Sequence, residues 1–419
     1  MDRPLDGLGI GWVMQPDADH LERTRPLLDR VDYLELAPET TWTTDRRGHL
    51  TPNGFHARFA EERARGLPFV AHSTALSMAA DPRGDEARRA RWLERVALDH
   101  ETFRFAWWTD HFGATSLPSR EGPRYVALPV PVPANDDTLA HLERTLDAMQ
   151  AVVPHVGFEN TAFHFAWDEA EHEPWLLRRA LAAKEGRHLL LDLHNLVLNA
   201  EQQGYDARRW LRTIDLSKVI EIHVAGGTTS DPAWLPSGRS LRLDGHDHAV
   251  PEGVWSLLVE VLPRCTNLRG VTLERMEGTV ESEADVAALA RELDRLRTIL
   301  EGPRPTQETA LDRALPFDRP HAPAAALDPD AYLALLRDAE LTSDDGRRMT
   351  ALLVAKLRFE RLQRGSDLAM QWFDESPQRF AELFRSYHLA TPMEATFPAQ
   401  EADRFFAFCE RRGLVRRVR

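Results

Sequence analysis

Residues 188–195 read HLLLDLHN, a short apolar run that ends in Asp192, His194 and Asn195. A continuous apolar run of this length is typical of a strand buried on both faces, as in a parallel sheet. Seven further runs of the same kind occur in the first 300 residues. They lie at residues 7–12, 33–37, 69–73, 105–112, 156–160, 219–225 and 270–276. The sequence therefore predicts eight buried strands.

Amphipathic segments separate these strands. Asn135 and Asp136 are candidate N-caps for one helix, and Ser282 is a candidate for another. The apolar stripes comprise Leu139, Leu142, Leu146, Met149 and Val153; Trp92, Val96 and Phe103; and Val286, Leu289, Leu293, Leu296 and Leu300. Eight alternating strands and helices predict an α/β fold, the TIM (β/α)8 barrel, over residues 1–301. A doubly wound open sheet is the alternative, but GLGIG at residues 7–11 lacks the third-glycine spacing of a dinucleotide-binding loop.

The chain changes character after the barrel. Prolines punctuate residues 302–329, which predicts a linker or a strap that wraps the barrel. Helical periodicity returns over residues 330–419, for example at Tyr332, Leu335 and Leu336. We therefore expect a small all-helical module at the C-terminal end of the chain.

Composition excludes several classes of protein. A net charge of −14 argues against a general nucleic-acid binder, which needs a basic face. The two cysteines, Cys265 and Cys409, are too few for a disulfide framework or a thiolate metal cluster, so a reducing cytoplasm is the expected compartment. The N-terminal residues lack the pattern of a signal peptide, and no apolar run of about 18 residues predicts a membrane span.

Metal-type ligands gather where the predicted strands end, which in a barrel is the catalytic face. The loop after strand seven adds a dense cluster, LDGHDHAVP at residues 243–251. Buried carboxylates are costly unless they are paired or bound to metal, and Arg275 or Lys218 could supply part of the pairing. Histidine and carboxylate together favour an open site for iron, zinc or manganese. The candidates are His72, His111, Glu159, Asp192, His194, Asn195, His223 and Glu274 on the strands, and Asp244 and His246 in the loop.

Seven short motifs occur in one order across residues 7–300. They are HSTALS (72–77), DHF (110–112), ENT (159–161), LDLHN (191–195), IHVAG (222–226), DGHDHAVP (244–251) with Trp255, and TLE (272–274). In this combination the chain resembles the multinuclear non-haem iron-dependent oxidative enzymes, formerly a family of unknown function, which include the methanobactin-forming oxidase. Any one motif is weak, but the ordered set is specific.

The resemblance implies two or three irons, mixed-valent Fe2+/Fe3+, with O2 as co-substrate. By matching position, the first iron would be held by His72, His111 and Glu159, and Glu159 would bridge to a second. The second would also take Asp192, His223 and Glu274, and the third Asn195, Asp244 and His246. His194, Asp247 and His248 would orient the ligands, and no catalytic residue is expected beyond these groups.

The resemblance also implies a substrate and a partner. The substrate would be a ribosomal precursor peptide in natural-product biosynthesis, oxidised at a cysteine side chain or a C-terminal residue. A partner protein usually presents it, and the helical residues 330–419 could be a fused equivalent or a plain stabilising appendage. The chain departs from the family at residues 38–42, PETTW, and at Trp12, both expected on the substrate rim.

Other functions remain open on the residues alone. A zinc- or manganese-dependent hydrolase of the endonuclease IV-like barrel type would use a similar ligand set, but it needs a basic rim for duplex binding. A sugar isomerase needs a lysine or histidine beside a divalent pair. A metal-storage protein would not need an open cluster at the active face.

Overall fold

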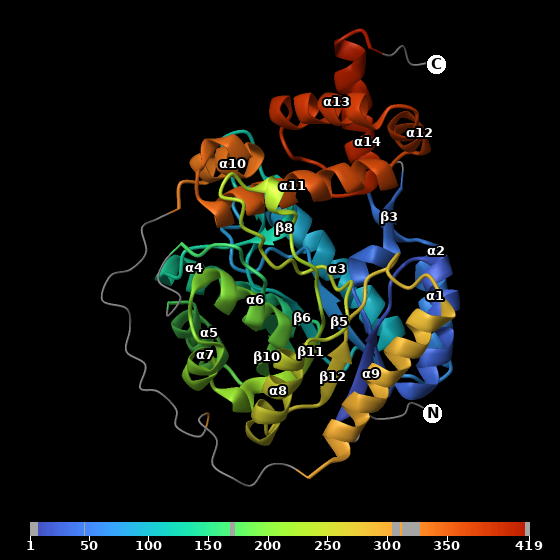
Figure 1. Cartoon of the computed structure of the whole chain (residues 1–419), viewed down its shortest axis with the longest axis vertical. Coiled ribbons are helices and arrows are strands. Elements are labelled where there is room, and N and C mark those ends of the chain that lie inside the picture. Colours follow the sequence, from blue (N-terminus) through green and yellow to red (C-terminus); the bar gives the residue numbers. More distant parts are fainter. Residues whose placement is uncertain (1–6, 46, 168–171, 304–310, 312–326, 415–419) are drawn as a thin grey trace.

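The computed structural model describes residues 7–45, 47–167, 172–303, 311 and 327–414. Eight strands form a closed barrel in which every neighbouring pair is parallel, in the order β1-β12-β11-β10-β9-β6-β5-β2 (Figure 1). The predicted TIM barrel is confirmed. Its strands are β1 (Gly9–Val13), β2 (Tyr33–Leu36), β5 (Phe69–Ser73), β6 (Trp108–His111), β9 (Val156–Glu159), β10 (Arg187–Asp192), β11 (Val219–Val224) and β12 (Gly270–Leu273).

Helices cover the barrel, and two of them begin at the predicted caps Asn135 and Ser282. The Asn135 side chain accepts a hydrogen bond from the Thr138 amide, and Ser282 forms a capping box with Asp285. Asp136 is the first residue of its helix rather than the cap. The helices are α1 (Ala18–Thr24), α2 (Gly54–Ala64), α3 (Glu86–Phe103), α4 (Asp136–Gln150), α5 (His172–Ala182), α6 (Leu193–Gln203), α7 (Ala207–Thr213), α8 (Glu252–Val261) and α9 (Glu283–Glu301).

Two antiparallel hairpins and several short 3-10 helices extend the loops. The hairpins pair β3 (Trp42–Thr44) with β4 (Leu50–Pro52) and β7 (Ala114–Leu117) with β8 (Arg124–Val130). The 3-10 helices lie at Arg25–Arg30, Pro38–Thr41, Leu216–Lys218, Pro232–Trp234, Leu262–Arg264 and Ala339–Leu341. Within the described residues, no helix has both the length and the apolar character needed to cross a bilayer.

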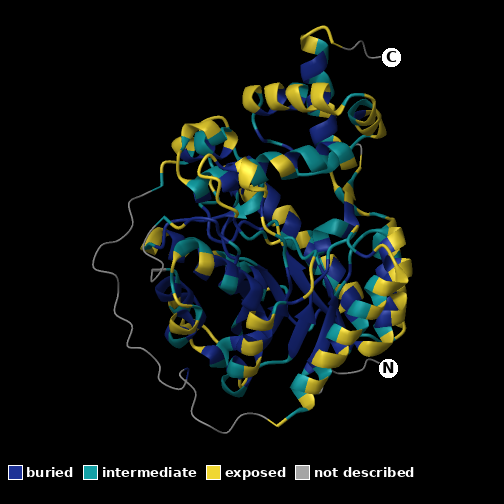
Figure 2. Ribbon diagram, viewed as in Figure 1, coloured by how far each residue is buried: buried dark blue, intermediate teal, exposed yellow. Residues whose placement is uncertain are grey.

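The barrel interior is closed by one large ring near the amino-terminal ends of the strands. Tyr33 is fully buried, and its hydroxyl donates to Glu221 Oε1 at 2.8 Å. Gly11 and Gly270 leave room for this ring, because a Cβ at either position would lie 2.5 Å or less from its atoms. The strands are the most completely buried part of the molecule (Figure 2). A catalytic site is thereby restricted to the opposite, carboxyl ends of the strands.

The C-terminal residues are helical, and their first part is continuous with the barrel core. Tyr332, Leu336 and Val354 belong to the same buried cluster as the barrel strands. A second, separate core forms around Leu362 and Phe380. Figure 1 shows α10 and α11 between the barrel and the outer helices. These elements are α10 (Pro329–Arg337), α11 (Asp345–Arg364), α12 (Asp367–Glu375), α13 (Pro377–Ala390) and α14 (Pro398–Arg411).

The division of the chain into domains stays a prediction. Most of the proline-rich segment 302–329 lies outside the described residues, so its interpretation as a linker or strap is not tested. Because Tyr332, Leu336 and Val354 belong to the core of the barrel, α10 and part of α11 pack against the barrel.

Candidate metal centre

The first group of ligand-type residues lies at the ends of three neighbouring strands. His72 ends β5, His111 ends β6 and Glu159 ends β9, and one ligand atom from each lies within 4.8 Å of the others. The Nε2 atoms of His72 and His111 lie 3.5 and 3.1 Å from Glu159 Oε2. Each ring is held through its other nitrogen, His72 Nδ1 at 2.9 Å from Thr109 Oγ1 and His111 Nδ1 at 3.0 Å from the Ser73 carbonyl. Both rings therefore present Nε2 to the centre.

A second group shares Glu159 with the first. It contains Glu159, Asp192, His223 and Glu274, all buried, with ligand atoms again within 4.8 Å. His223 Nδ1 lies 3.1 Å from Glu274 Oε2 and 3.7 Å from Glu159 Oε1. Since Oε2 of Glu159 faces the two histidines of the first group, its two oxygens point toward different groups. This is the geometry of a bridging carboxylate.

The remaining predicted ligands lie beside the second group. His246 Nε2 is 2.7 Å from Asp244 Oδ1 and 3.5 Å from Glu274 Oε2. Asn195 donates its Nδ2 to Glu159 Oε1 at 3.3 Å, which leaves its Oδ1 available. The three residues come from the first turn of α6 and from the loop between β11 and α8. All nine predicted ligands thus lie at one end of the barrel.

The polar atoms that lack hydrogen bonds identify where a cation would fit. Buried polar atoms normally have partners, and leaving one without costs about 1–3 kcal/mol. Six such atoms converge here, and each belongs to a predicted ligand. They are Glu159 Oε2, Asp192 Oδ2, Asn195 Oδ1, His223 Nδ1, His246 Nε2 and Glu274 Oε2. A nitrogen and oxygen donor set of this kind suits iron, manganese or zinc, so these residues fit a multinuclear metal centre.

The ionisation behaviour of the carboxylates supports the same conclusion. Burial raises the pKa of Glu159 well above its usual range, and the nearby Asp192 carboxylate adds to the effect. Burial also raises the pKa of Asp192 to about 7, with Glu274 contributing. Burial lowers the pKa of His72 well below its ordinary value, which keeps the ring in the neutral form that binds metal. A cation at the centre would relieve the repulsion among these carboxylates.

Local backbone structure explains how Asp192 is aimed. Asp192 ends β10 and is also the N-cap of α6, and its Oδ1 accepts from the Asn195 amide at 2.7 Å. The side chain of Asn160 bonds to both the amide and the carbonyl of Asp192, at 2.9 and 2.8 Å. Only Oδ2 of Asp192 is left for a metal. The strand is shorter than predicted because this cap starts the helix at Leu193, so His194 and Asn195 are helical.

A buried glutamate that the sequence reasoning missed holds His223 from behind. Glu35 lies in the middle of β2 and accepts from His223 Nε2 at 2.9 Å. It is 1% exposed, and burial raises the pKa of its carboxyl to about 8. The pairing orients the ring so that Nδ1 faces Glu274 and Glu159. The signal was present in the sequence, because Glu35 interrupts an otherwise apolar strand, as Glu159 does.

Below Glu35, a second missed carboxylate is fully hydrogen-bonded. Glu221 receives bonds from the Tyr33 hydroxyl, from Thr272 Oγ1 at 2.7 Å and from Trp107 Nε1 at 2.6 Å. It lies within 4.8 Å of Glu35 and His223. Since its oxygens already have donors, Glu221 stabilises the floor of the site rather than adding a ligand.

The predicted orienting residues differ from one another. His194 is fully buried with Nε2 3.9 Å from Asp244 Oδ1. Asp247 Oδ1 accepts from the Thr228 amide at 2.9 Å and pairs with His248 Nδ1 at 2.8 Å, so it fastens the loop. The side chain of His248 is 62% exposed. His248 therefore faces solvent and acts only through Asp247.

The expectation that Trp12 and Trp42 lie on the substrate rim is wrong. Trp12 and Trp42 are not on an open rim: Trp12 is 1% exposed and stacks on His20, and Trp42 donates to Asp99 in the core. The alternative cations do not pair with the cluster either. Arg275 binds Glu292 at 3.2 Å, and Lys218 precedes β11 at the opposite end of the barrel. Large aromatic residues bury themselves, which sequence position alone does not reveal.

Fold and site together define the class of protein, a TIM barrel with a candidate multinuclear metal centre at its carboxyl end. Residues 7–301 match the family model described as "RiPP precursor modification enzyme MbnB/TglH/ChrH". The chain therefore belongs to this family of enzymes that modify the precursors of ribosomally made peptides.

The chain is also similar to several curated relatives and solved structures. A UPF0276 protein of Streptomyces avermitilis is 30% identical over 304 residues, which is 70% of this chain but only 55% of that relative's length. A UPF0276 protein of Bordetella bronchiseptica is 29% identical over 311 residues, 71% of this chain and 95% of the relative. Among solved structures, L-ribulose 3-epimerase has a TM-score of 0.43 at 14% identity, covering 70% of this chain and 95% of its own. D-Psicose 3-epimerase from Clostridium cellulolyticum H10 has a TM-score of 0.46 at 12% identity, covering 70% of this chain and 100% of its own.

Proposed function

We propose that the chain is a multinuclear non-haem iron enzyme that uses O2 to oxidise a ribosomally made peptide, at a cysteine side chain or a C-terminal residue. The observation that carries this proposal is the convergence, at one end of the barrel, of six buried ligand atoms that make no hydrogen bond. Family membership supplies the class of substrate. When bound, iron would contribute Lewis acidity and redox capacity.

In this proposal, the side chains of the protein bind the metal ions and orient the ligands. His72, His111 and Glu159 would bind one ion; Asp192, His223 and Glu274 would share Glu159 for the second. Asn195, Asp244 and His246 would bind the third. Thr109, Ser73 and Glu35 fix the ring nitrogens that face away from the ions. No other side chain is needed as a general acid or base.

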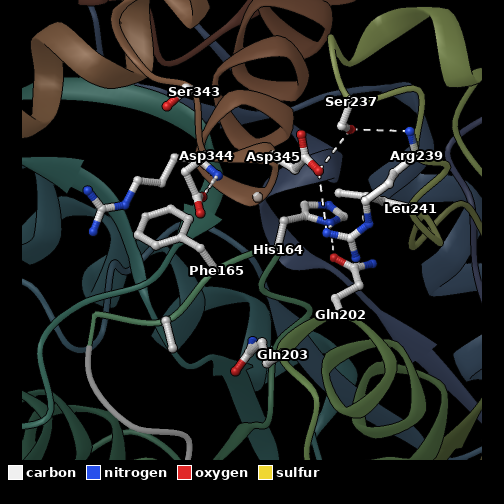
Figure 3. A pocket seen from close by; sticks show the side chains of 13 residues that line it. His164, Phe165, Gln202, Gln203, Ser237, Arg239, Leu241, Ser343, Asp344 and Asp345 are labelled. Atoms are coloured by element: carbon white, nitrogen blue, oxygen red, sulfur yellow. Dashed lines mark hydrogen bonds and ion pairs between the residues drawn. The ribbon is translucent and has the colours of Figure 1, made fainter.

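The proposed binding place for the peptide is a cleft lined by segments of the chain that continue into the predicted ligands. It has a volume of about 680 Å³ and lies between the start of α11 and three barrel segments (Figure 3). These segments are the loop after β9, helix α6 and the loop after β11. Glu159 is the residue just before the first loop, while α6 carries Asn195 and the loop after β11 carries Asp244. Phe165 and Leu241 give the cleft an apolar face, and Arg347 stacks over Phe165 with 5.4 Å between guanidinium and ring centre. Arginine and aromatic side chains are favoured where peptides dock.

The partners and compartment follow from the same proposal. The peptide would be the substrate, presented by a separate partner protein or by the fused helices of residues 330–419. The net charge of −14 argues against nucleic acid as a partner. Cys265 and Cys409 are buried thiols, which agrees with a cytoplasmic location.

Metal analysis and intact-mass measurement test the proposal. After anaerobic purification, the protein should contain iron above one equivalent, and up to three, with a mixed-valent signal in electron paramagnetic resonance. Co-expression with a short peptide encoded beside the gene should yield an oxidised peptide only in the presence of O2. Stoichiometric zinc without iron, in a protein that hydrolyses its substrate, would instead identify the endonuclease IV-like hydrolase.

A further inference from the structure

The loop between β11 and α8 carries Asp244 and His246, and it is long enough to need support. Its two limbs pair through the Ser230 amide and the Leu241 carbonyl at 2.7 Å, and through the Leu243 amide and the Thr228 carbonyl at 2.8 Å. The pairing resumes beyond the ligands, where the His248 amide donates to the Gly226 carbonyl at 3.1 Å. Asp244 and His246 lie between these two paired stretches, so their conformation also depends on what packs against the loop.

Helix α11 packs directly on that loop. Met349 is fully buried against Leu235 and Leu241, which are 3% and 4% exposed. Leu243 and Leu353 border the same cluster. A contact between residues more than a hundred positions apart thus closes an apolar seam over the loop. Leu241 and Leu243 are two of the three residues that precede Asp244.

Polar contacts fix the start of the helix to the loop tip. Asp345 Oδ2 accepts from Ser237 Oγ at 2.9 Å and pairs with Arg239 Nη1 at 3.3 Å (Figure 3). The side chain of Arg239 is 58% exposed, so this ion pair contributes little free energy. It serves mainly to set the position of the loop along α11. The contacts position the tip of the loop relative to α11.

A third contact joins α11 to the loop after β9. Gly346 lies so close to the His164 carbonyl that a Cβ would approach it to 2.0 Å. His164 Nδ1 lies 2.7 Å from Gln202 Oε1, and Gln202 Nε2 donates to the Arg242 carbonyl at 2.6 Å. Gln202 thus connects the segment under α11 to the residue two positions before Asp244.

We propose that α11 is a positioning element of the metal centre: Met349 and Asp345 hold the loop so that Asp244 and His246 reach their ion. This inference rests on the metal binding in the proposed function. The proposed metal positions then fall into two classes, according to whether α11 supports their ligands. Two ions would be held by residues at the ends of strands, whereas binding of an ion by Asn195, Asp244 and His246 would depend on a helix outside the family-matched residues 7–301.

The test uses the full chain with Met349→Ala and a matched control on the same helix. Leu362→Ala removes a comparable, fully buried side chain, but Leu362 packs in the outer core around Phe380 and not on the loop. Apo-protein is titrated anaerobically with Fe2+ alone, and bound ions per chain are counted. Met349→Ala should bind one ion about ten- to a hundred-fold more weakly while the other two are retained. Leu362→Ala should bind all ions with the affinity of the wild type. Met349→Leu should restore the affinity for the ion that Met349→Ala binds more weakly.

Each other result has a definite meaning. Equal affinities in Met349→Ala and Leu362→Ala would overturn the inference, as would equal weakening of all ions in Met349→Ala. Circular dichroism and melting curves of both variants show whether the mutation has merely unfolded the chain; in that case Asp345→Asn, which keeps a hydrogen-bond acceptor for Ser237, takes the place of Met349→Ala. A wild type that binds no iron would refute the proposed function itself, and is thereby distinguished from failure of this inference.

Discussion

Glu159 is the residue on which the two best-defined ligand groups meet. Its Oε2 lies 3.1 Å from His111 Nε2, and its Oε1 lies 3.7 Å from His223 Nδ1. The carboxylate is 2% exposed, so solvent cannot compensate its charge. A residue that serves two groups should matter more for metal binding than one that only fastens a loop.

The comparison of Glu159→Ala with His248→Ala tests this hierarchy. Removing Glu159 takes a donor from two positions, so we expect the loss of about one to two ions per chain. His248 faces solvent, and its removal leaves Asp247 still bound to the Thr228 amide, so the metal content should stay close to that of the wild type. Metal is counted after identical anaerobic purification. Similar losses in the two variants would contradict the bridging role.

Glu35 offers a prediction about an orienting residue. Glu35→Gln keeps the size of the side chain but replaces the carboxyl group that accepts from His223 Nε2 with an amide, which is a weaker acceptor. The ring becomes less basic at Nδ1, so the affinity for Fe2+ should fall about ten-fold at one position. Glu62→Gln is the control, because Glu62 is also buried but pairs with Arg65 on α2. An unchanged affinity in Glu35→Gln would show that the pairing is only structural.

At the scale of elements, the parts that could be predicted are those that depend on local pattern. The eight strands follow from short apolar runs, and α4 and α9 begin at Asn135 and Ser282 because those side chains satisfy free amides. Ligands at strand ends follow from the barrel itself. The place of His194 and Asn195 in a helix did not, because Asp192 can end a strand and cap a helix at once.

What the sequence did not reveal depends on contacts between distant residues. Glu35 meets His223 across 188 positions, and Met349 meets Leu241 across more than a hundred. No periodicity records such contacts. The β7–β8 hairpin was also missed, since β8 contains Pro129 and reads as a loop. The aromatic residues Trp12 and Trp42 looked like rim residues because their burial comes from tertiary packing.

At the scale of the whole molecule, the metal centre places several raised pKa values in one buried volume. Burial raises the pKa of Asp192 to about 7 and that of Glu35 to about 8. Burial opposes protonation of His246, but Asp244 and Glu274 outweigh it and raise its pKa to about 10. A group whose folded pKa exceeds its unfolded value contributes stability that is lost as pH rises through the folded pKa. The metal-free protein should therefore lose stability between pH 6.5 and 8.

Metal should reverse this trend, which gives a prediction for the intact chain. Bound ions would replace the protons on Asp192 and His246, and metal binding strengthens with pH because fewer protons must be displaced. The rise in Tm on adding Fe2+ should thus be larger at pH 8 than at pH 6.5, by about 2–6 °C. The window avoids the histidines with lowered pKa values, such as His72, which are already neutral above pH 6.5. Differential scanning calorimetry of apo- and iron-loaded protein under nitrogen measures the rise in Tm at each pH. In the control variant Asp192→Asn, the rise in Tm should differ less between the two pH values. An increment that is equal at the two pH values would mean that the ions do not displace protons from this cluster, and that the convergent carboxylates are not their ligands.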